Sequence, residues 1–160
     1  MKMKIRVAGY AKLAKLWEKN REEAISYHTE YFEQRYKDNE QYELVGVYVD
    51  ITGAKDIKKR PEMIRLISDC IKGNVDEIVA QTKGYLAANT KEFCFLIKYL
   101  FELSPPVNIK TDDLDYNINT LKDFDNQRAE LYRMAQNYIR ILSDEYEEWK
   151  EEIEFILSKY

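Results

Sequence analysis

The sequence is poor in the residues that form covalent cross-links and metal sites. Its 160 residues include two cysteines and one histidine, and no Cys-x-x-Cys motif occurs. Cys70 and Cys94 lie far apart, each inside an apolar pattern typical of a helix. We therefore predict that both are buried free thiols in a reducing cytoplasm, and that the protein uses no metal ion and no cofactor.

The sequence also lacks a long hydrophobic run. No stretch approaches the roughly 18 apolar residues that a membrane-spanning helix needs. Lys2, Lys4 and Arg6 precede only a short apolar segment, so the N-terminus does not have the pattern of a signal peptide. These features predict a cytoplasmic protein without a membrane partner.

Positive charge is scarce outside the N-terminal part of the chain. Residues 1–60 contain 13 Lys or Arg and 10 Asp or Glu, whereas residues 61–160 contain 12 and 19. A protein binds the nucleic-acid backbone through a basic face, and only the N-terminal part offers one, which is weak. We therefore expect DNA binding to be weak or absent.

Hydrophobic periodicity alternates between strand and helix along the first two thirds of the chain. Patterns typical of strands cover residues 4–10, 43–50, 77–81 and 107–110, and helical patterns cover 15–37, 61–73 and 90–103. This order predicts an α/β fold with a mainly parallel central sheet of four to five strands and helices on both faces. The first helix is expected to pack through one face that contains Leu16, Ala24, Tyr27, Tyr31 and Phe32.

Glycine and proline are absent from about residue 121 to the end of the sequence. Apolar residues recur there at steps of three and four, which predicts one long amphipathic helix of about 55 Å. Such a helix is longer than the domain is wide, so we expect it to project or to pack against another chain. The predicted oligomer contacts are Leu131, Tyr138, Leu142, Trp149, Ile153 and Ile156.

Three segments carry motifs of one protein family. Residues 59–79, KRPEMIRLISDCIKGNVDEIV, resemble R-P-x-[FM]-x-x-M-[IL]-x-D-C-x-x-G-x-[IV]-D-x-I, and residues 42–50, YELVGVYVD, resemble W-E-L-V-G-x-Y-x-D. Residues 7–11, VAGYA, are similar to a first strand that leads into Y-x-R-V-S. Together these segments resemble the serine recombinases of the resolvase and invertase superfamily, particularly the large members from mobile elements.

The resemblance implies a domain organisation and a reaction. It implies a resolvase-like, catalytic-type domain at residues 1–118 and a dimerisation-type helix at 119–160. Family members tend to continue into a DNA-binding domain, but this sequence ends at Tyr160, so we expect no separate DNA-binding domain. In the family, a serine after the first strand attacks a DNA phosphodiester. Several arginines hold the phosphate and stabilise the charge of the transition state.

The positions that correspond to the family's catalytic residues are largely substituted. Ala14 takes the position of the nucleophile, Lys12 that of the first arginine, and Ala24 that of a glutamine on the first helix. An alanine has no group that can attack phosphorus. We therefore expect the nucleophilic step of the family reaction to be lost.

The segment AQTKGYLAAN at residues 80–89 departs from the family in the same direction. It corresponds to T-K-S-x-S-R-F-x-R-N, so that Gln81 replaces a lysine while Tyr85 and Ala88 replace two arginines. Losing one charge-stabilising donor commonly lowers the rate by about 10²–10³. We therefore predict that this chain does not cleave DNA by the family mechanism.

The family-site remnants that keep a polar side chain are Lys12, Asp50, Thr52 and Arg60. Arg60 is either a relic phosphate contact or a surface ion-pair partner, and the sequence favours neither. Asp50 is interpreted as a cap at the end of its strand. A nearby basic group consists of Lys12, Lys55, Lys58 and Lys59. It forms either a residual anion site or, as is more common, a solvated loop.

Other chemistry-bearing residues have ordinary structural interpretations. His28 lies in the first predicted helix without a carboxylate and hydroxyl to pair with, so we expect no catalytic role for it. Trp17 and Trp149 are suited to stack on bases, but at helical spacing they more often fill cores or interfaces. Residues 143–160 contain seven acidic and two basic side chains, which indicates the solvated face of a helix rather than a metal site.

Three functions remain open from the sequence. The first is a non-catalytic relative of serine recombinases that acts as an oligomerisation or regulatory module, as a homodimer or as a heterodimer with an active recombinase through its C-terminal helix. The second is an enzyme with relocated phosphoryl-transfer chemistry at Tyr10, Thr52 or Thr82, or a weak DNA-binding protein. The third is a decaying mobile-element product that folds but has no selected role.

Overall fold

Four parallel strands form the centre of the protein. The computed structural model describes residues 3–112 and 135–160. The strands are β1 (Ile5–Leu13), β2 (Tyr42–Ile51), β3 (Glu77–Ala80) and β4 (Asn108–Thr111), paired in the order β2-β1-β3-β4. All three pairings are parallel. The predicted α/β fold with a parallel sheet is therefore confirmed.

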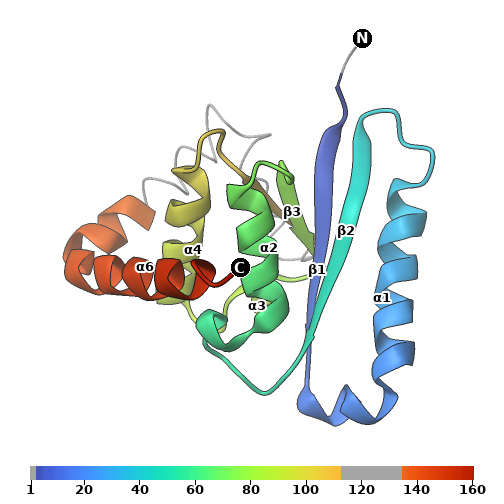
Figure 1. Ribbon diagram of the computed structural model, residues 1–160, viewed down its shortest axis with the longest axis horizontal. Coiled ribbons are helices and arrows are strands. Elements are labelled where there is room, and N and C mark those ends of the chain that lie inside the picture. The colour runs from blue at the N-terminus through green and yellow to red at the C-terminus, as the bar shows by residue number, and fades with distance from the viewer. Residues whose placement is uncertain (1–2, 113–134) are drawn as a thin grey trace.

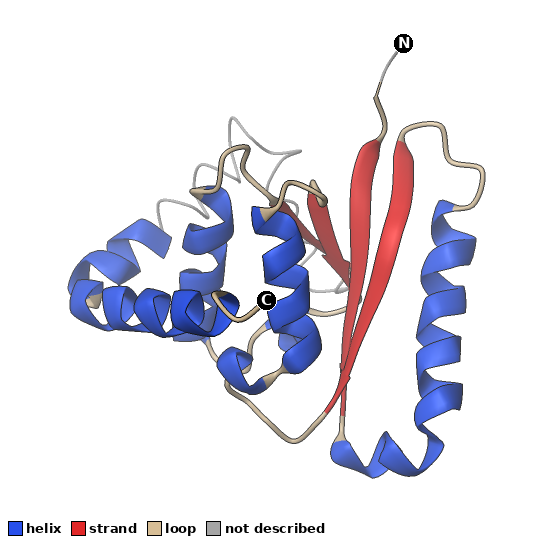
Figure 2. Ribbon diagram, viewed as in Figure 1, coloured by secondary structure: helices blue, strands red, loops and turns tan. Residues whose placement is uncertain are grey.

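Helices cover both faces of this sheet (Figures 1 and 2). They are α1 (Arg21–Tyr36), α2 (Pro61–Ile71), α3 (Lys83–Leu86), α4 (Thr90–Phe101) and α6 (Ser143–Leu157), with short 3-10 helices η1 (Lys15–Asn20) and η2 (Ile57–Lys59). Helix α1 lies on one face, and α2 and α4 lie on the other. The short helix α3 was not expected, because four residues are too few to give a periodic pattern.

Alternation along the strands divides the core into two clusters. Val7 and Val79 point toward α1 and pack against Phe32 and Tyr36. The next residue along β1, Ala8, belongs to the larger cluster on the opposite face, together with side chains of α2, α4 and α6. This alternation is the period of two that a strand buried on both faces requires.

The packing face of α1 differs from the prediction. The buried residues of α1 follow one another at steps of four and are Ala24, His28, Phe32 and Tyr36. Leu16 and Tyr27, which were expected on the packed face, are 72% and 65% exposed. The reason is local geometry: the chain is a 3-10 helix up to Asn20, so Leu16 is not in phase with the α-helix that begins at Arg21.

The predicted C-terminal helical region is present, but within the described residues it is neither one continuous helix nor a projecting one. Residues 135–141 are helical, the backbone leaves the helix at Leu142 (φ −111°, ψ 30°), and α6 follows. Helix α6 then lies against α2, α4 and η2 of its own chain (Figure 1). Tyr146, Trp149 and Ile153 are buried in the same core as α4, because that helix supplies the aromatic surface that the apolar stripe of α6 covers.

The predicted oligomer contacts therefore have different environments. Trp149 and Ile153 are buried within the chain, Leu142 and Ile156 pack partly against the same core, and Tyr138 is 39% exposed. Leu131 and the predicted domain boundary at residue 118 lie outside the described residues. Within the described ranges, no helix combines the length and the apolar character needed to cross a membrane.

Candidate functional site at the carboxyl edge of the sheet

Parallel pairing gathers several predicted site residues at one edge of the sheet. Strand β1 ends at Leu13 and β2 at Ile51, and Lys12 stands directly opposite Asp50 in the register. Ala14 follows β1 and is exposed at the start of η1. The carboxyl edge of a parallel sheet is where open α/β folds place their ligands. Lys12, Ala14, Asp50 and Thr52 thus meet where the sequence predicted a site.

Asp50 connects three elements at this edge. Its carboxylate is buried and accepts hydrogen bonds from the Tyr10 hydroxyl at 2.8 Å and from the backbone N–H groups of Glu62 and Met63 at 2.9 Å each. The last two are free N–H groups in the first turn of α2, so Asp50 caps that helix. The sequence interpreted Asp50 as a cap of the loop that follows its strand, but its carboxylate instead caps helix α2 across that loop.

Arg60 is buried and holds two loops together. Its side chain is 1% exposed. The guanidinium donates from Nε to the carbonyl of Ala54 (3.2 Å), from Nη1 to those of Tyr85 (2.8 Å) and Leu86 (3.1 Å), and from Nη2 to that of Lys55 (3.0 Å). Burial excludes the surface ion pair. The four carbonyls give the guanidinium a structural role that the sequence did not indicate, because none of them belongs to a side chain.

Lys12 lies in a crowded, positively charged environment. Partial burial lowers the pKa of Lys12, and the positive charges of Arg60 and Lys55 lower it further against the opposing effect of Asp50.

The hydroxyl groups considered as alternative nucleophiles are engaged in local structure. Tyr10 is fully buried, and burial followed by the charge of Asp50 raises the pKa of its phenol, so it neither reaches a phosphodiester nor ionises readily. Thr52 Oγ1 accepts from the N–H of Ala54 (3.0 Å), and Thr82 Oγ1 caps α3 by accepting from the N–H of Gly84 (3.2 Å).

Three of the substituted positions line one pocket on the α1 side of the sheet. The pocket has a volume of about 590 Å³ and is lined by Leu13, Trp17, Glu23, Ala24, Tyr27, His28, Gln81 and Tyr85. Ala24, Gln81 and Tyr85 are therefore brought together, as their correspondence to one family site implies. Ala88 does not line this pocket and is exposed. None of the described lining residues is Lys or Arg.

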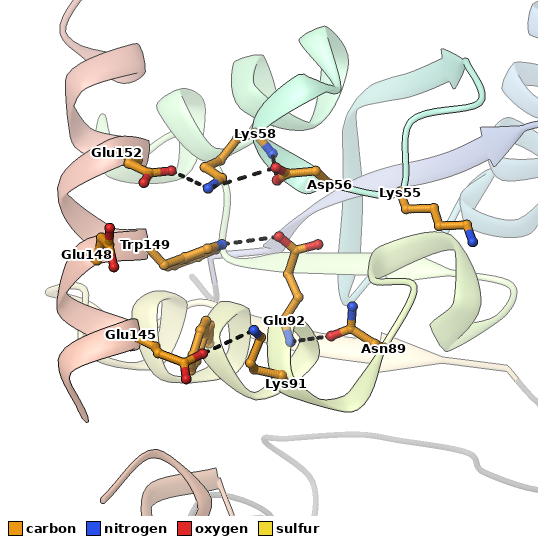
Figure 3. Close-up of a pocket in the computed structure, with 11 residues that line it drawn as sticks. Lys55, Asp56, Lys58, Asn89, Lys91, Glu92, Glu145, Glu148, Trp149 and Glu152 are labelled. Carbon is orange, nitrogen blue, oxygen red and sulfur yellow. Dashed lines mark hydrogen bonds and ion pairs between the residues drawn. The ribbon is translucent and has the colours of Figure 1, made fainter. Parts of the chain in front are cut away.

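A second pocket, of about 450 Å³, lies between α6 and the loop that contains η2 (Figure 3). Lys58 lies between Asp56 and Glu152, and Lys91 pairs with Glu145 at 3.1 Å. The acidic face of α6 thus pairs with Lys58, one member of the basic group that the sequence left as either an anion site or a solvated loop. The sequence missed this contact because the two charged segments are about 90 residues apart along the chain.

A buried carboxylate fixes α6 in this position. Glu92 accepts the Trp149 indole N–H at 3.2 Å and the backbone N–H of Ile57 at 3.2 Å (Figure 3). Burial raises the pKa of Glu92, and these two hydrogen bonds oppose the rise. Helix α6, helix α4 and the η2 loop are therefore joined at one carboxylate.

The comparisons with known proteins agree on the architecture. No protein-family model and no curated protein sequence matches the chain significantly. Among solved structures, the N-terminal catalytic domain of TP901-1 integrase is similar with a TM-score of 0.60 and 16% identity, covering 87% of this chain and 97% of that one. A resolvase-family site-specific recombinase from Streptococcus pneumoniae is similar with a TM-score of 0.55 and 22% identity, covering 89% and 95%.

This chain has the fold of a serine recombinase catalytic domain. The similarity spans nearly all of both solved chains, so it includes the sheet, the flanking helices and the C-terminal helical region. At these identities the likeness establishes the fold alone. The correspondence of Ala14, Tyr85 and Ala88 to catalytic positions remains a prediction from the sequence motifs.

Proposed function

We propose that this protein is a serine recombinase relative that does not cleave DNA and acts as an oligomerisation or regulatory module in DNA recombination. The observation that carries the proposal is the chemistry of the carboxyl edge of the sheet. Ala14 presents no hydroxyl there, and Arg60 donates to four backbone carbonyls instead of facing solvent. Phosphoryl transfer depends on a positioned nucleophile and on cations around the phosphate, and this edge supplies neither in the required form.

A covalent-capture assay tests the loss of cleavage. The full chain is incubated with supercoiled plasmid and with nicked duplexes, and protein–DNA adducts are separated on denaturing gels, with an active serine recombinase as the positive control. We expect no adduct and no relaxation. Any adduct that survives denaturation would refute the proposal.

A gain-of-function variant separates the missing nucleophile from the missing cations. We expect Ala14→Ser to remain inactive, because Tyr85 and Ala88 supply no positive charge for the transition state. Cleavage by Ala14→Ser alone would show that the rest of the site is competent, and the interpretation of a degenerate site would then be wrong.

Weak DNA binding is part of the proposal and rests on the position of α6. Its carboxylates at Glu145 and Glu152 pair with Lys91 and Lys58, so these two cations are neutralised within the chain. A negative helix beside a phosphate backbone is repelled. We expect fluorescence anisotropy with a labelled duplex to give no saturable binding at 150 mM salt, whereas replacing Glu145, Glu148 and Glu152 by Gln gives salt-dependent binding. Tight binding by the unmodified chain would contradict the proposal.

Self-association, or pairing with an active recombinase, is the proposed mode of action. Because Trp149 and Ile153 are buried within the chain, the C-terminal residues available for pairing are the exposed ones, among them Ile141 (80% exposed) and Phe155 (66% exposed). Exposed apolar side chains grouped on one segment are typical of an interface.

Sedimentation velocity at high micromolar concentration tests this mode. We expect a dimer that Ile141→Glu with Phe155→Glu dissociates, whereas the control Ile71→Glu, at a residue of α2 that is 46% exposed, leaves it intact. A monomer in the unmodified chain would exclude the homodimer. The mixed dimer is tested by adding the chain to an active recombinase and measuring recombination, with inhibition as the expected result.

A further inference from the structure

The pocket on the α1 side of the sheet has the size and shape of a small-molecule site. Its volume of about 590 Å³ lies within the usual range of about 300–1,000 Å³ for such sites. It is built from the end of β1, from η1, from the first half of α1 and from the segment after β3. The pocket is thus supported by the sheet and by α1, although its outer wall belongs to η1.

Aromatic side chains dominate the wall of this pocket. Trp17, Tyr27, His28 and Tyr85 all line it. Trp17 is 45% exposed and Tyr27 is 65% exposed, while none of the residues of η1 is buried. These exposed rings at the rim of the pocket are not packed into the core. They are therefore available to contact a ligand.

Two observations on α1 point to binding rather than to core packing. His28 is buried at the pocket wall, and its Nδ1 atom has no hydrogen-bond partner. Its ring meets that of Tyr27 edge-on, with the centroids 5.2 Å apart and an interplanar angle of 85°, so the Tyr27 ring is held in a defined orientation. A buried polar atom that is left unsatisfied destabilises the free protein, which is the pattern of a functional site.

The charge of the pocket selects the chemistry of its ligand. Glu23 carries the formal negative charge among the lining residues, and none of the described lining residues is Lys or Arg. Burial lowers the pKa of His28, which keeps its imidazole neutral at pH 7. The faces of aromatic rings are negative as well. Among the described lining residues an anion therefore finds no counter-charge, whereas a cation finds a carboxylate and several ring faces.

We propose that this pocket binds an organic cation of the alkylammonium class, such as a quaternary ammonium group, between the rings of Trp17, Tyr27 and Tyr85 with Glu23 as counter-ion. Aromatic rings attract a cation that sheds little hydration on binding, and the methyl groups of a quaternary ammonium make it such a cation. A quaternary ammonium group is also bulkier than a metal ion, so it fits better against a wall of aromatic rings. The pocket includes three of the substituted family positions, Ala24, Gln81 and Tyr85, so this inference rests on the proposed loss of cleavage there.

Ligand titration followed by tryptophan fluorescence tests the proposal. Choline is the probe, and 3,3-dimethylbutanol is its neutral control of the same shape. Trp149 is buried in the core, so a Trp149→Phe background leaves Trp17 as the only reporter, and isothermal titration of the unmodified chain checks the result. We expect saturable quenching by choline and at least about fivefold weaker binding of the neutral analogue.

Substitutions at the exposed Glu22 and Glu23 and at the partly buried Tyr85 locate the site. We expect Glu23→Gln to weaken choline binding about three- to tenfold, whereas Glu22→Gln, one residue earlier on α1 and outside the pocket lining, leaves it unchanged. Replacing Tyr85 by Leu should weaken binding about tenfold. Equal weakening by Glu22→Gln and Glu23→Gln would mean a non-specific charge effect and would overturn the proposal.

Further ligands identify the source of the cation and expose a wrong assignment. A peptide with trimethyl-lysine that binds more tightly than free choline would support a protein side chain as the ligand, and the reverse order would support a free small molecule. Equal affinity for choline and its neutral analogue would show that the pocket does not recognise the positive charge, and would overturn the proposal. Tighter binding of inorganic phosphate than of choline, or no saturation with any ligand, would refute the proposal.

Discussion

Replacing Arg60 by methionine tests whether this side chain is an internal clamp. Arg60 is 1% exposed and donates four hydrogen bonds to carbonyls of two loops, at 2.8–3.2 Å. Methionine has a similar length and an apolar end, so Arg60→Met fills much of the space but leaves four carbonyls without this donor. The variant therefore removes the hydrogen bonds while changing the packing little.

The expected loss of stability is large for a single substitution. A hydrogen bond to a charged group contributes about 1.5–3 kcal/mol, and partial access of water to the loops reduces the sum. Removing one partner from a buried charged network commonly costs about 3–5 kcal/mol. That is a large part of the total free energy of unfolding of a domain, which is about 5–15 kcal/mol. With a urea m-value of about 2 kcal/mol/M, the midpoint should fall by roughly 2 M.

Urea unfolding monitored by circular dichroism measures this change. Arg60→Lys should recover only a small part of the loss, because one ammonium group cannot reach both loops. The control is Arg21→Met, at an exposed arginine that pairs with Glu18 within one turn of helix and should cost less than about 0.5 kcal/mol. A decrease of less than about 1 kcal/mol in the free energy of unfolding for Arg60→Met, at an unchanged m-value, would refute the role of Arg60 as a clamp. It would favour the alternative interpretation of Arg60 as a phosphate contact.

Three further substitutions test the packing and the pH response. A Cβ on Gly9 would lie 2.6 Å from the Phe32 ring, so Gly9→Ala should cost about 1–3 kcal/mol in thermal unfolding, whereas Gly53→Ala, which meets nothing within 4 Å, should be neutral or slightly stabilising. Trp149→Ala should cost about 3–5 kcal/mol in urea, and a negligible loss would mean that α6 does not dock on its own domain. Burial lowers the pKa of His28 in the folded state, so the unfolded state binds a proton on this side chain more tightly than the folded state does. The free energy of unfolding is therefore highest above the unfolded pKa of about 6.5, and it decreases as the pH falls from there toward the lower pKa of the folded state. The chain has one histidine, so the stability difference between the unmodified chain and His28→Gln across pH 5–7.5 isolates this effect, and a difference that is constant with pH would contradict it.

The strands were predictable because each is a short apolar run between polar turns. The predicted range 77–81 became β3 (Glu77–Ala80), and 107–110 became β4 (Asn108–Thr111). Parallel pairing follows from the alternation of strands with helices, since each crossover must return the chain to the same edge. The meeting of Lys12, Ala14 and Asp50 at the carboxyl edge follows from that pairing alone.

The packing partners of individual residues were not predictable in the same way. Arg60 bonds to backbone carbonyls 25 and 26 residues away, and a carbonyl has no signature in the sequence. The packed face of α1 shifted because the chain keeps a 3-10 helix up to Asn20, and periodicity does not reveal where one helical form gives way to the other.

The sequence by itself determined the fold class, the parallel sheet and the lack of a serine after the first strand, because these depend on local patterns and on residue identity. Only the tertiary structure decided what covers the apolar stripe of the C-terminal helix. A stripe of this kind shows that a helix needs a partner, but the partner is chosen by the surface that fits it. Here α4 and Glu92 of the same chain provide that surface, so Trp149 and Ile153 are buried within the chain rather than presented to another.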